Sequence, residues 1–289
     1  MSSTLLYTVL TLSVLGTGAA VILYFVAQKF KVIEDARIDS VQEALPGANC
    51  GGCGYAGCRV FAETCVKNGK LDNLFCPVGG NEVMAGVASI LGLEAIKKDP
   101  RVAVIRCNGT CDNRLKTSQF DGVETCAISA FFYSGETGCQ FGCLGYGDCY
   151  RACKFDAIVM HPETGIPEII DEKCTSCGAC VAACPKNLIE LRKKGPKDRK
   201  IYVSCRNTEK GGVARKSCKV ACIGCSKCLQ ECRYDAIVIE NNLAFIDSDK
   251  CKLCRKCVSV CPTNSIIEVN FPPRKITSDS TTEVITEKS

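Results

Sequence analysis

Residues 174–185 read CTSCGACVAACP, and residues 251–262 read CKLCRKCVSVCP. Each run spaces its cysteines as C-x2-C-x2-C-x3-C-P, which is a ligand spacing of iron–sulfur clusters. Three thiolates on one loop can hold three irons of a 4Fe–4S cluster, while the fourth cysteine reaches a neighbouring cluster. Two such runs in one chain predict a protein that carries several clusters and transfers electrons.

The N-terminal stretch from residue 5 to residue 26, LLYTVLTLSVLGTGAAVILYFV, is apolar and uncharged. As a helix it would be about 33 Å long, enough to cross the hydrocarbon core of a bilayer. A cleaved leader would start with basic residues and have a shorter apolar core. Lys29 and Lys31 follow the stretch, so the positive-inside rule puts the rest of the chain in the cytoplasm. We therefore expect a single-pass, uncleaved anchor with the N-terminus outside.

Zinc and disulfides are the alternative uses for the 26 cysteines of this chain. Zinc prefers four ligands, often paired C-x2-C units mixed with histidine, and His161 is the only histidine. Disulfides need an oxidising compartment, which a cytoplasmic location excludes. A multi-zinc interaction scaffold is thus the less favoured hypothesis, and 4Fe–4S clusters are the expected cofactors.

Several other chemistries find no support in the sequence. It has no Ser-His-Asp constellation and no phosphate-binding loop, so we expect no catalytic residues. The Gly-x-Gly-x-x-Gly match at residues 52–57 lacks a preceding strand, so no flavin or NAD is expected here. Nucleic acid is not an expected partner, because basic residues are not interleaved with stacking aromatics.

The expected fold class is a small, cofactor-dominated α+β protein with two tandem ferredoxin-like units. Cysteine-rich units this small bury little apolar surface, so cluster binding would supply much of their folding free energy. We expect a charged connector helix over residues 30–45 and a second helix over residues 81–98. The expected divisions are an anchor (1–28), an iron–sulfur module with the connector (29–100), the two units (101–195 and 196–271) and a disordered tail (272–289).

The two units are an internal repeat, visible in the spacing of their cysteines. Without a gap, Cys126, Cys139, Cys143, Cys149 and Cys153 align on Cys205, Cys218, Cys222, Cys228 and Cys232. The exchange of the fourth ligand in two-cluster proteins then predicts three complete sets. These are Cys222, Cys225, Cys228 and Cys261; Cys251, Cys254, Cys257 and Cys232; and Cys174, Cys177, Cys180 and Cys153.

The remaining set in the first unit is incomplete, because Tyr146 stands where the second unit has Cys225. Cys143, Cys149 and Cys184 are left there, with Cys139 as the nearest fourth ligand and a 3Fe–4S cluster as the alternative. The N-terminal module supplies Cys50, Cys53, Cys58 and Cys76, separated by glycines that allow close backbone approach.

Six cysteines are not assigned by these patterns. They are Cys65, Cys107, Cys111, Cys126, Cys205 and Cys218. Buried structural thiols are one reading, because free cysteine packs as a small hydrophobe. A sixth cluster is the other, built either from Cys107, Cys111 and Cys126 with Cys139, or from Cys126, Cys139, Cys205 and Cys218. The sequence does not decide between them.

Basic residues gather between the two units. The segment Lys186–Lys219 holds twelve Lys and Arg residues against three acidic ones, in a chain of net charge +5. It is either a docking face for an acidic electron donor or a solvated linker. If the segment is a docking face, the apparent KM for the donor should rise when four of its lysines are exchanged for Glu. These are Lys193, Lys194, Lys197 and Lys200.

Several motifs together resemble the B subunit of the Rnf electron-transport complex. They are LPGANCGGCGYAGC at residues 45–58, CPVGG at 76–80, GCLGYGDC at 142–149 and CIGC at 222–225. The resemblance implies an ion-translocating ferredoxin:NAD⁺ oxidoreductase, a translocase of the bacterial inner membrane. It also implies soluble reduced ferredoxin as donor, five or six clusters in this chain, and flavins and the NAD site in other membrane and peripheral subunits. The alternative is an iron–sulfur subunit of a hydrogenase or formate dehydrogenase.

Overall fold

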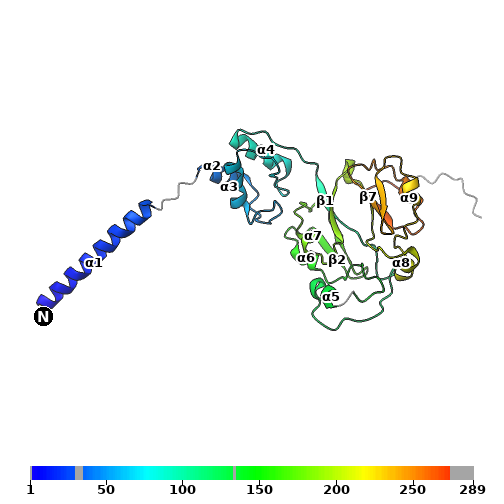
Figure 1. Ribbon diagram of the computed structural model, residues 1–289, viewed down its shortest axis with the longest axis horizontal. Coiled ribbons are helices and arrows are strands. Elements are labelled where there is room, and N and C mark those ends of the chain that lie inside the picture. Colours follow the sequence, from blue (N-terminus) through cyan, green and yellow to red (C-terminus); the bar gives the residue numbers. More distant parts are fainter. Residues whose placement is uncertain (1, 30–34, 133–134, 274–289) are drawn as a thin grey trace, which may run out of the picture.

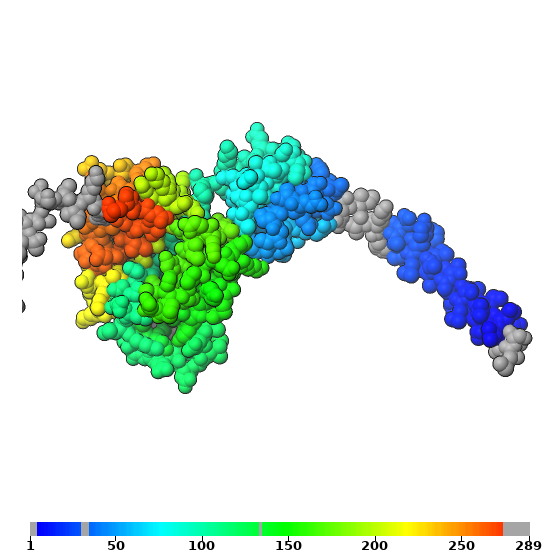
Figure 2. Space-filling view, turned by 180° about the vertical axis from the view of Figure 1, so that it is seen from behind, coloured from blue at the N-terminus to red at the C-terminus, as the bar shows by residue number. Residues whose placement is uncertain are grey.

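The computed structural model describes residues 2–29, 35–132 and 135–273 (Figure 1). Helix α1 (Ser2–Lys29) projects away from the rest of the chain, as Figure 2 also shows from behind. Among the described helices it alone is long and apolar enough to cross a membrane, with a mean hydropathy of 2.1 over Leu5–Lys29 and none of that window buried. A helix with no buried side needs an apolar surrounding, which associates this chain with a membrane.

Three helices form the N-terminal module: α2 (Arg37–Ala44), α3 (Cys58–Asn68) and α4 (Gly80–Leu91). The expected connector helix over residues 30–45 falls partly outside the described residues, which omit 30–34. Its described part, α2, is no free connector, since Ile38 and Val41 are buried in the core of the module.

The expected helix over residues 81–98 is shorter than its periodicity suggested. Helix α4 ends at Leu91, because Gly92 adopts a left-handed φ of 67° that stops the helix. The chain then turns back, and the backbone N–H of Lys98 donates to Oδ1 of Asn81 at 2.9 Å. The tail that we expected to be disordered lies, from residue 274 onward, outside the described residues.

The rest of the described chain forms two similar units (Figure 1). In the first, β1 (Arg101–Ile105) pairs with β4 (Ile189–Lys193), and β2 (Ile158–His161) pairs with β3 (Ile166–Ile169). Short helices α6 (Asp148–Ala152) and α7 (Ala179–Ala183) follow the cysteine loops, and α5 (Cys126–Phe132) lies beside them. All strand pairs in both units are antiparallel.

The second unit repeats this plan. Strand β5 (Lys200–Val203) pairs with β8 (Ile266–Val269), and β6 (Ile237–Glu240) pairs with β7 (Leu243–Ile246). Its helices are α8 (Gly211–Ser217), α9 (Lys227–Gln230) and α10 (Lys256–Ser259), and the turn η1 (Pro196–Asp198) precedes β5. The prediction of a small α+β protein with one N-terminal apolar helix and tandem iron–sulfur units is confirmed.

Strand register corrects the alignment of the two units. Ile105 lies opposite Ile189, and Val203 lies opposite Ile266. Ile189 and Ile266 each come five residues after the cysteine of a Cys-Pro pair, so they are equivalent. Their partners Ile105 and Val203 are then equivalent too.

Cys107 lies two residues after Ile105, and Cys205 lies two residues after Val203, so Cys107 corresponds to Cys205. The gap-free alignment that paired Cys126 with Cys205 is therefore wrong. Cys126 belongs to a longer segment between Cys107 and Cys139, which the second unit lacks.

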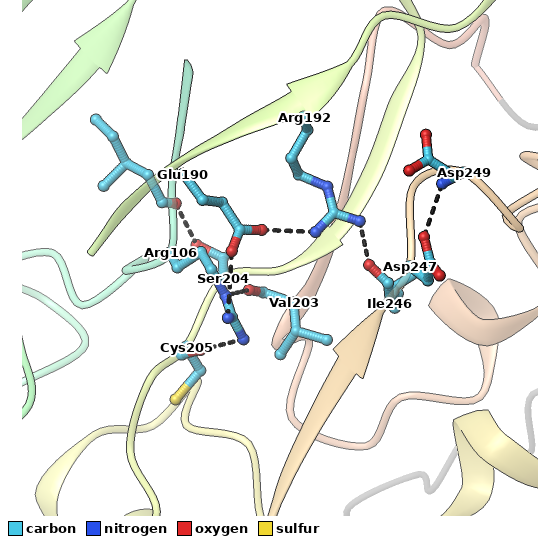
Figure 3. Close-up of polar contacts among 10 residues, drawn as sticks. Arg106, Glu190, Arg192, Val203, Ser204, Cys205, Ile246, Asp247 and Asp249 are labelled. Carbon is cyan, nitrogen blue, oxygen red and sulfur yellow. Dashed lines mark hydrogen bonds and ion pairs between the residues drawn. The ribbon is translucent and has the colours of Figure 1, made fainter. Parts of the chain in front are cut away.

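Buried arginines hold the two units together (Figure 3). Arg106, directly after β1, donates to the carbonyl oxygens of Val203 and Cys205, both at 3.3 Å. Arg192 on β4 donates to the carbonyl oxygen of Ile246 in the second unit. Glu190 lies between the guanidinium groups, 3.4 Å from Arg106 and 2.6 Å from Arg192. Buried charges need such partners, so this network fixes how the units sit together.

The basic segment Lys186–Lys219 is no solvated linker, because it contains β4, β5 and α8. Lys200 is 4% exposed and pairs with Asp171, so it cannot meet a docking partner. Lys193 pairs with Asp99 at 2.6 Å. Part of the positive charge of this segment is thus paired with acidic residues of the protein itself.

Candidate iron–sulfur sites

All 26 cysteines lie within the described residues, and none forms a disulfide. Among the described residues no three His, Cys, Asp or Glu side chains converge on a single ion, as a tetrahedral zinc site would require. Thiols of the first unit instead line shared cavities, four to each cavity. A 4Fe–4S cluster fits such groups, because it binds one thiolate per iron around a larger core.

The second unit brings together both of its predicted cysteine sets. Burial raises the pKa of Cys228 to about 11, and the neighbouring charges of Cys222, Cys225 and Cys261 contribute. The second set surrounds Cys257, whose pKa burial and the charges of nearby thiolates raise to about 12. Those contributing thiolates are Cys251, Cys254, Cys228 and Cys232.

One site of the first unit has the same arrangement. A cavity beside β2 and α7 is lined by the cysteines of one predicted set, Cys153, Cys174, Cys177 and Cys180. The backbone N–H of Ala103 donates to Sγ of Cys174 at 3.5 Å. Such N–H donors stabilise a thiolate and are one determinant of cluster potential.

At the incomplete site of the first unit, the structure places a cysteine that sequence analysis did not choose beside the three expected ones. A second cavity is lined by Cys143, Cys149, Cys184 and Cys126. Tyr146 does not line it; its ring packs 6.3 Å from that of Phe120. Cys139, the fourth ligand expected from proximity in sequence, lies in a different group. Cysteine spacing did not indicate Cys126, because this residue lies in an extra segment of the first unit. Only the strand register reveals that segment.

The N-terminal module holds Cys53, Cys58 and Cys76 as neighbours. The pKa of Cys76 is raised by burial, and the charges of Cys53 and Cys58 add to the rise. The backbone N–H groups of Gly79 and Gly52 donate to Sγ of Cys76 and Cys50, at 3.4 and 3.5 Å. Gly52, between Cys50 and Cys53, brings the backbone close to sulfur as predicted for glycines between ligands, whereas Gly79 does so after the last cysteine of the module.

Cys65 and Cys111 remain outside these sets. Cys65 is fully buried within α3, and its pKa is raised to about 11, first by burial and then by the charges of the neighbouring Cys53 and Cys76. Cys111 is exposed. Cys65 thus packs as a core residue, the alternative that sequence analysis had kept open for all six unassigned cysteines.

The protonation of the cysteine ligands indicates whether these sites suit an iron–sulfur cluster. Ligation requires thiolates, yet burial and mutual repulsion raise the pKa of these thiols. A cationic iron core would offset both penalties, as a bound metal deprotonates a coordinating thiol. The cysteine groups therefore suit a bound iron–sulfur core better than an empty apolar interior.

Family comparisons agree with this chemistry. A model for a 4Fe–4S dicluster domain matches residues 138–188 and again residues 221–265. A model for a putative Fe–S cluster matches residues 45–78. The fold and its cysteine sites define an iron–sulfur electron-transfer protein that binds 4Fe–4S clusters.

Relatives extend over most of the chain. It is 45% identical over 266 residues to the B subunit of the Na(+)-translocating ferredoxin:NAD(+) oxidoreductase complex of Acetobacterium woodii, covering 92% of this chain and 78% of that protein. It is 40% identical to the B subunit of an ion-translocating oxidoreductase complex of Methanosarcina acetivorans, covering 92% and 99%. The chain belongs to the family of B subunits of ion-translocating oxidoreductase complexes. This membership replaces the alternatives of a hydrogenase or formate dehydrogenase subunit and of a zinc scaffold.

Proposed function

We propose that this chain is a membrane-anchored relay that takes single electrons from reduced ferredoxin and passes them to the other subunits of its complex. Bound clusters supply the one-electron chemistry, while the protein supplies ligands, spacing and exclusion of water. The relatives in A. woodii and Clostridium ljungdahlii are named as subunits of ferredoxin:NAD(+) oxidoreductases, which supports the donor and the complex.

The proposed ligands of five clusters follow from the cysteine groups. They are Cys50, Cys53, Cys58 and Cys76; Cys153, Cys174, Cys177 and Cys180; Cys126, Cys143, Cys149 and Cys184; Cys222, Cys225, Cys228 and Cys261; and Cys232, Cys251, Cys254 and Cys257. The proposed divisions are an anchor (1–28), the iron–sulfur module (29–100) and the two units (101–195 and 196–271). Four ligands at every site favour 4Fe–4S over 3Fe–4S clusters.

The observation that carries this proposal is that cysteine groups lie next to one another within each unit, and that the N-terminal module contacts the first unit. Gly52 of the N-terminal module packs against Cys177, where an added Cβ would lie 2.7 Å from the carbonyl oxygen. Within the first unit, the charge of Cys149 contributes to the raised pKa of Cys180, after burial and nearer thiolates. In the second unit Cys228 acts in the same way on Cys257. Such neighbouring groups support a path for electrons within each unit and between the first unit and the module.

The second unit is the proposed point of entry. Cys225 and Cys254 are exposed, so a donor could approach their sites closely. Lys250, Lys252 and Lys256 surround Cys254 and are exposed. Of the counterparts of these lysines in the first unit, Lys173, Thr175 and Ala179, only Lys173 is basic. An acidic ferredoxin would be steered to the second unit by this charge.

The anchor supports the proposed location. The apolar span ends at Lys29, followed in sequence by Lys31, which favours a cytoplasmic position for the bulk of the chain. The chain would then be a single-pass protein of the bacterial inner membrane. The N-terminal module follows the anchor directly and is the proposed point where electrons leave for membrane partners.

The experiment uses the full chain, purified anaerobically in detergent and mixed with reduced ferredoxin in a stopped-flow spectrometer. We expect the visible absorbance of the clusters to bleach, with a rate that falls steeply as salt screens the encounter. A colourless protein that contains zinc, or a brown protein that dithionite bleaches and reduced ferredoxin does not, would contradict the proposal.

A further inference from the structure

A sixth group of four cysteines lies at the junction between the two units. Its members are Cys107, Cys139, Cys205 and Cys218, and together they line one small cavity. Three of them fall outside the residues that match the dicluster domain, which are 138–188 and 221–265. We propose that these four cysteines hold a further 4Fe–4S cluster, which connects the two ferredoxin-like units.

The four thiols are close neighbours. Cys139, Cys205 and Cys218 are each 8% exposed. Burial raises the pKa of Cys218, and the charges of Cys107 and Cys139 raise it further. Burial and the charge of Cys107 likewise raise the pKa of Cys139. This set differs from both groupings that the sequence had suggested, because neither combined Cys107 with Cys205.

The site is built from two equivalent pairs. Strand register makes Cys107 the counterpart of Cys205, and the repeat spacing makes Cys139 the counterpart of Cys218. Each unit thus contributes the same two ligands. One unit therefore holds only half of the four-cysteine site, and the site is complete only where the two units meet.

Contacts around the pairs show the same symmetry. The residue before Cys139 is Gly138, and the residue before Cys218 is Ser217. An added Cβ at Gly138 would lie 3.8 Å from Cα of Ser217. The two equivalent segments therefore meet at the centre of the junction.

Polar groups around the cavity suit an anionic occupant. The backbone N–H of Cys143 donates to Sγ of Cys107 at 3.4 Å. Asn207, which is 1% exposed, donates from its backbone to Sγ of Cys205 at 3.4 Å and from Nδ2 to Sγ of Cys139 at 3.7 Å. These donors favour thiolates.

Positive charge is also concentrated here. Arg106, Arg114 and Arg206 line the cavity together with the cysteines. Arg106 donates to the carbonyl oxygen of Cys205, as Figure 3 shows, and Arg114 donates to that of Cys143. Four structural thiols would need neither the amide donors nor the arginines. A cluster with four thiolates carries net negative charge, which the arginines offset.

The position of the site gives it a role. On one side the N–H of Cys143, from the adjoining group in the first unit, contacts Cys107. On the other side the backbone of Cys222, from the adjoining group in the second unit, lies beside the thiol of Cys205. This junction site thus fills the gap in the series of neighbouring groups. The role as a bridge rests on the proposed relay, whereas the site itself does not depend on the donor.

The first test is a count of iron and acid-labile sulfide on the anaerobically purified full chain. We expect about 24 of each, equal to six four-iron clusters. A double variant, Cys139→Ser with Cys218→Ser, should lose about four of each. The control, Cys111→Ser, alters an exposed thiol and should keep the full count. About 20 irons in the unaltered chain, with or without one zinc, would overturn the site.

A second variant leaves all ligands in place, in case the double variant folds poorly. Asn207→Ala removes one donor to Cys139 and should change the EPR signal and potential of one cluster while iron content stays the same. An unchanged set of EPR signals and potentials would contradict a cluster beside Asn207.

The bridging role has its own readout. In the Cys139→Ser, Cys218→Ser variant, reduced ferredoxin should still bleach the second unit rapidly, while the remaining clusters stay oxidised at least tenfold longer. Full bleaching at the unaltered rate would overturn the bridge. Loss of all bleaching by ferredoxin, with normal bleaching by dithionite, would instead refute the proposed donor.

Discussion

The backbone N–H of Cys126 donates to Oδ1 of Asp148 at 3.0 Å. The next N–H, of Ala127, donates to Oδ2 of the same carboxylate at 2.9 Å. Asp148 begins α6 and Cys126 begins α5, so one side chain joins the starts of two helices. This link holds Cys126 beside Cys149, at the site where Tyr146 leaves a ligand missing.

We predict that Asp148→Ala lowers occupancy of this site. Losing a side chain that caps backbone N–H groups costs about 1 kcal/mol, and Cys126 would no longer be held in place. We expect a loss of up to about four irons per chain, measured chemically after anaerobic purification. Asp148→Asn keeps one acceptor oxygen and should recover part of the loss. The exposed Asp112→Ala serves as the control; equal iron content in all variants would refute the link.

Replacing the proposed ligand itself gives a sharper prediction. Cys126→Ser should leave three thiolates at this site and convert its cluster to a 3Fe–4S form, visible by EPR after oxidation. The control Cys111→Ser alters an exposed thiol outside every group. If Cys126→Ser leaves the cluster type unchanged, Cys126 is no ligand.

Charge around Cys254 should govern the encounter with ferredoxin. Lys252→Glu with Lys256→Glu should raise the apparent KM about tenfold at low salt, with little change in maximal rate. The difference should shrink at high salt, where charges are screened.

The matched control is Lys154→Glu with Lys173→Glu, which changes the charge equally beside cysteines of the first unit. These lysines are also exposed. Steady-state rates with reduced ferredoxin are the measurement. An equal rise in KM for both pairs would mean that net charge matters and that the second unit is not the docking site.

Contact between the N-terminal module and the first unit should control the last transfer step. Gly52→Ala would place a Cβ 2.7 Å from the carbonyl oxygen of Cys177, so the two parts must move apart. We expect unchanged iron content and slower electron transfer into the module. Time-resolved spectroscopy measures the rate of this transfer. Gly86→Ala on α4 meets nothing within 4 Å and should have no effect. Equal rates in both variants would rule out transfer across this contact.

The sequence by itself determined the features that depend on local spacing. Cysteines within one loop, such as Cys251, Cys254 and Cys257, are brought together by a few residues of backbone, so their spacing predicts a shared site. The membrane helix is equally local, because the length and apolarity of one segment set it. The family resemblance rested on the same short motifs.

Only the tertiary structure decided how distant cysteines combine. Cys126 reaches its site through a carboxylate on another helix, and no spacing rule specifies that contact. Cys107 and Cys205 lie almost a hundred residues apart and meet because β1 and β5 run to the same junction, where Arg106 joins them. Ligands contributed by different units depend on strand register and on packing between units. These are properties of the folded chain, so the sequence left the grouping of these cysteines open.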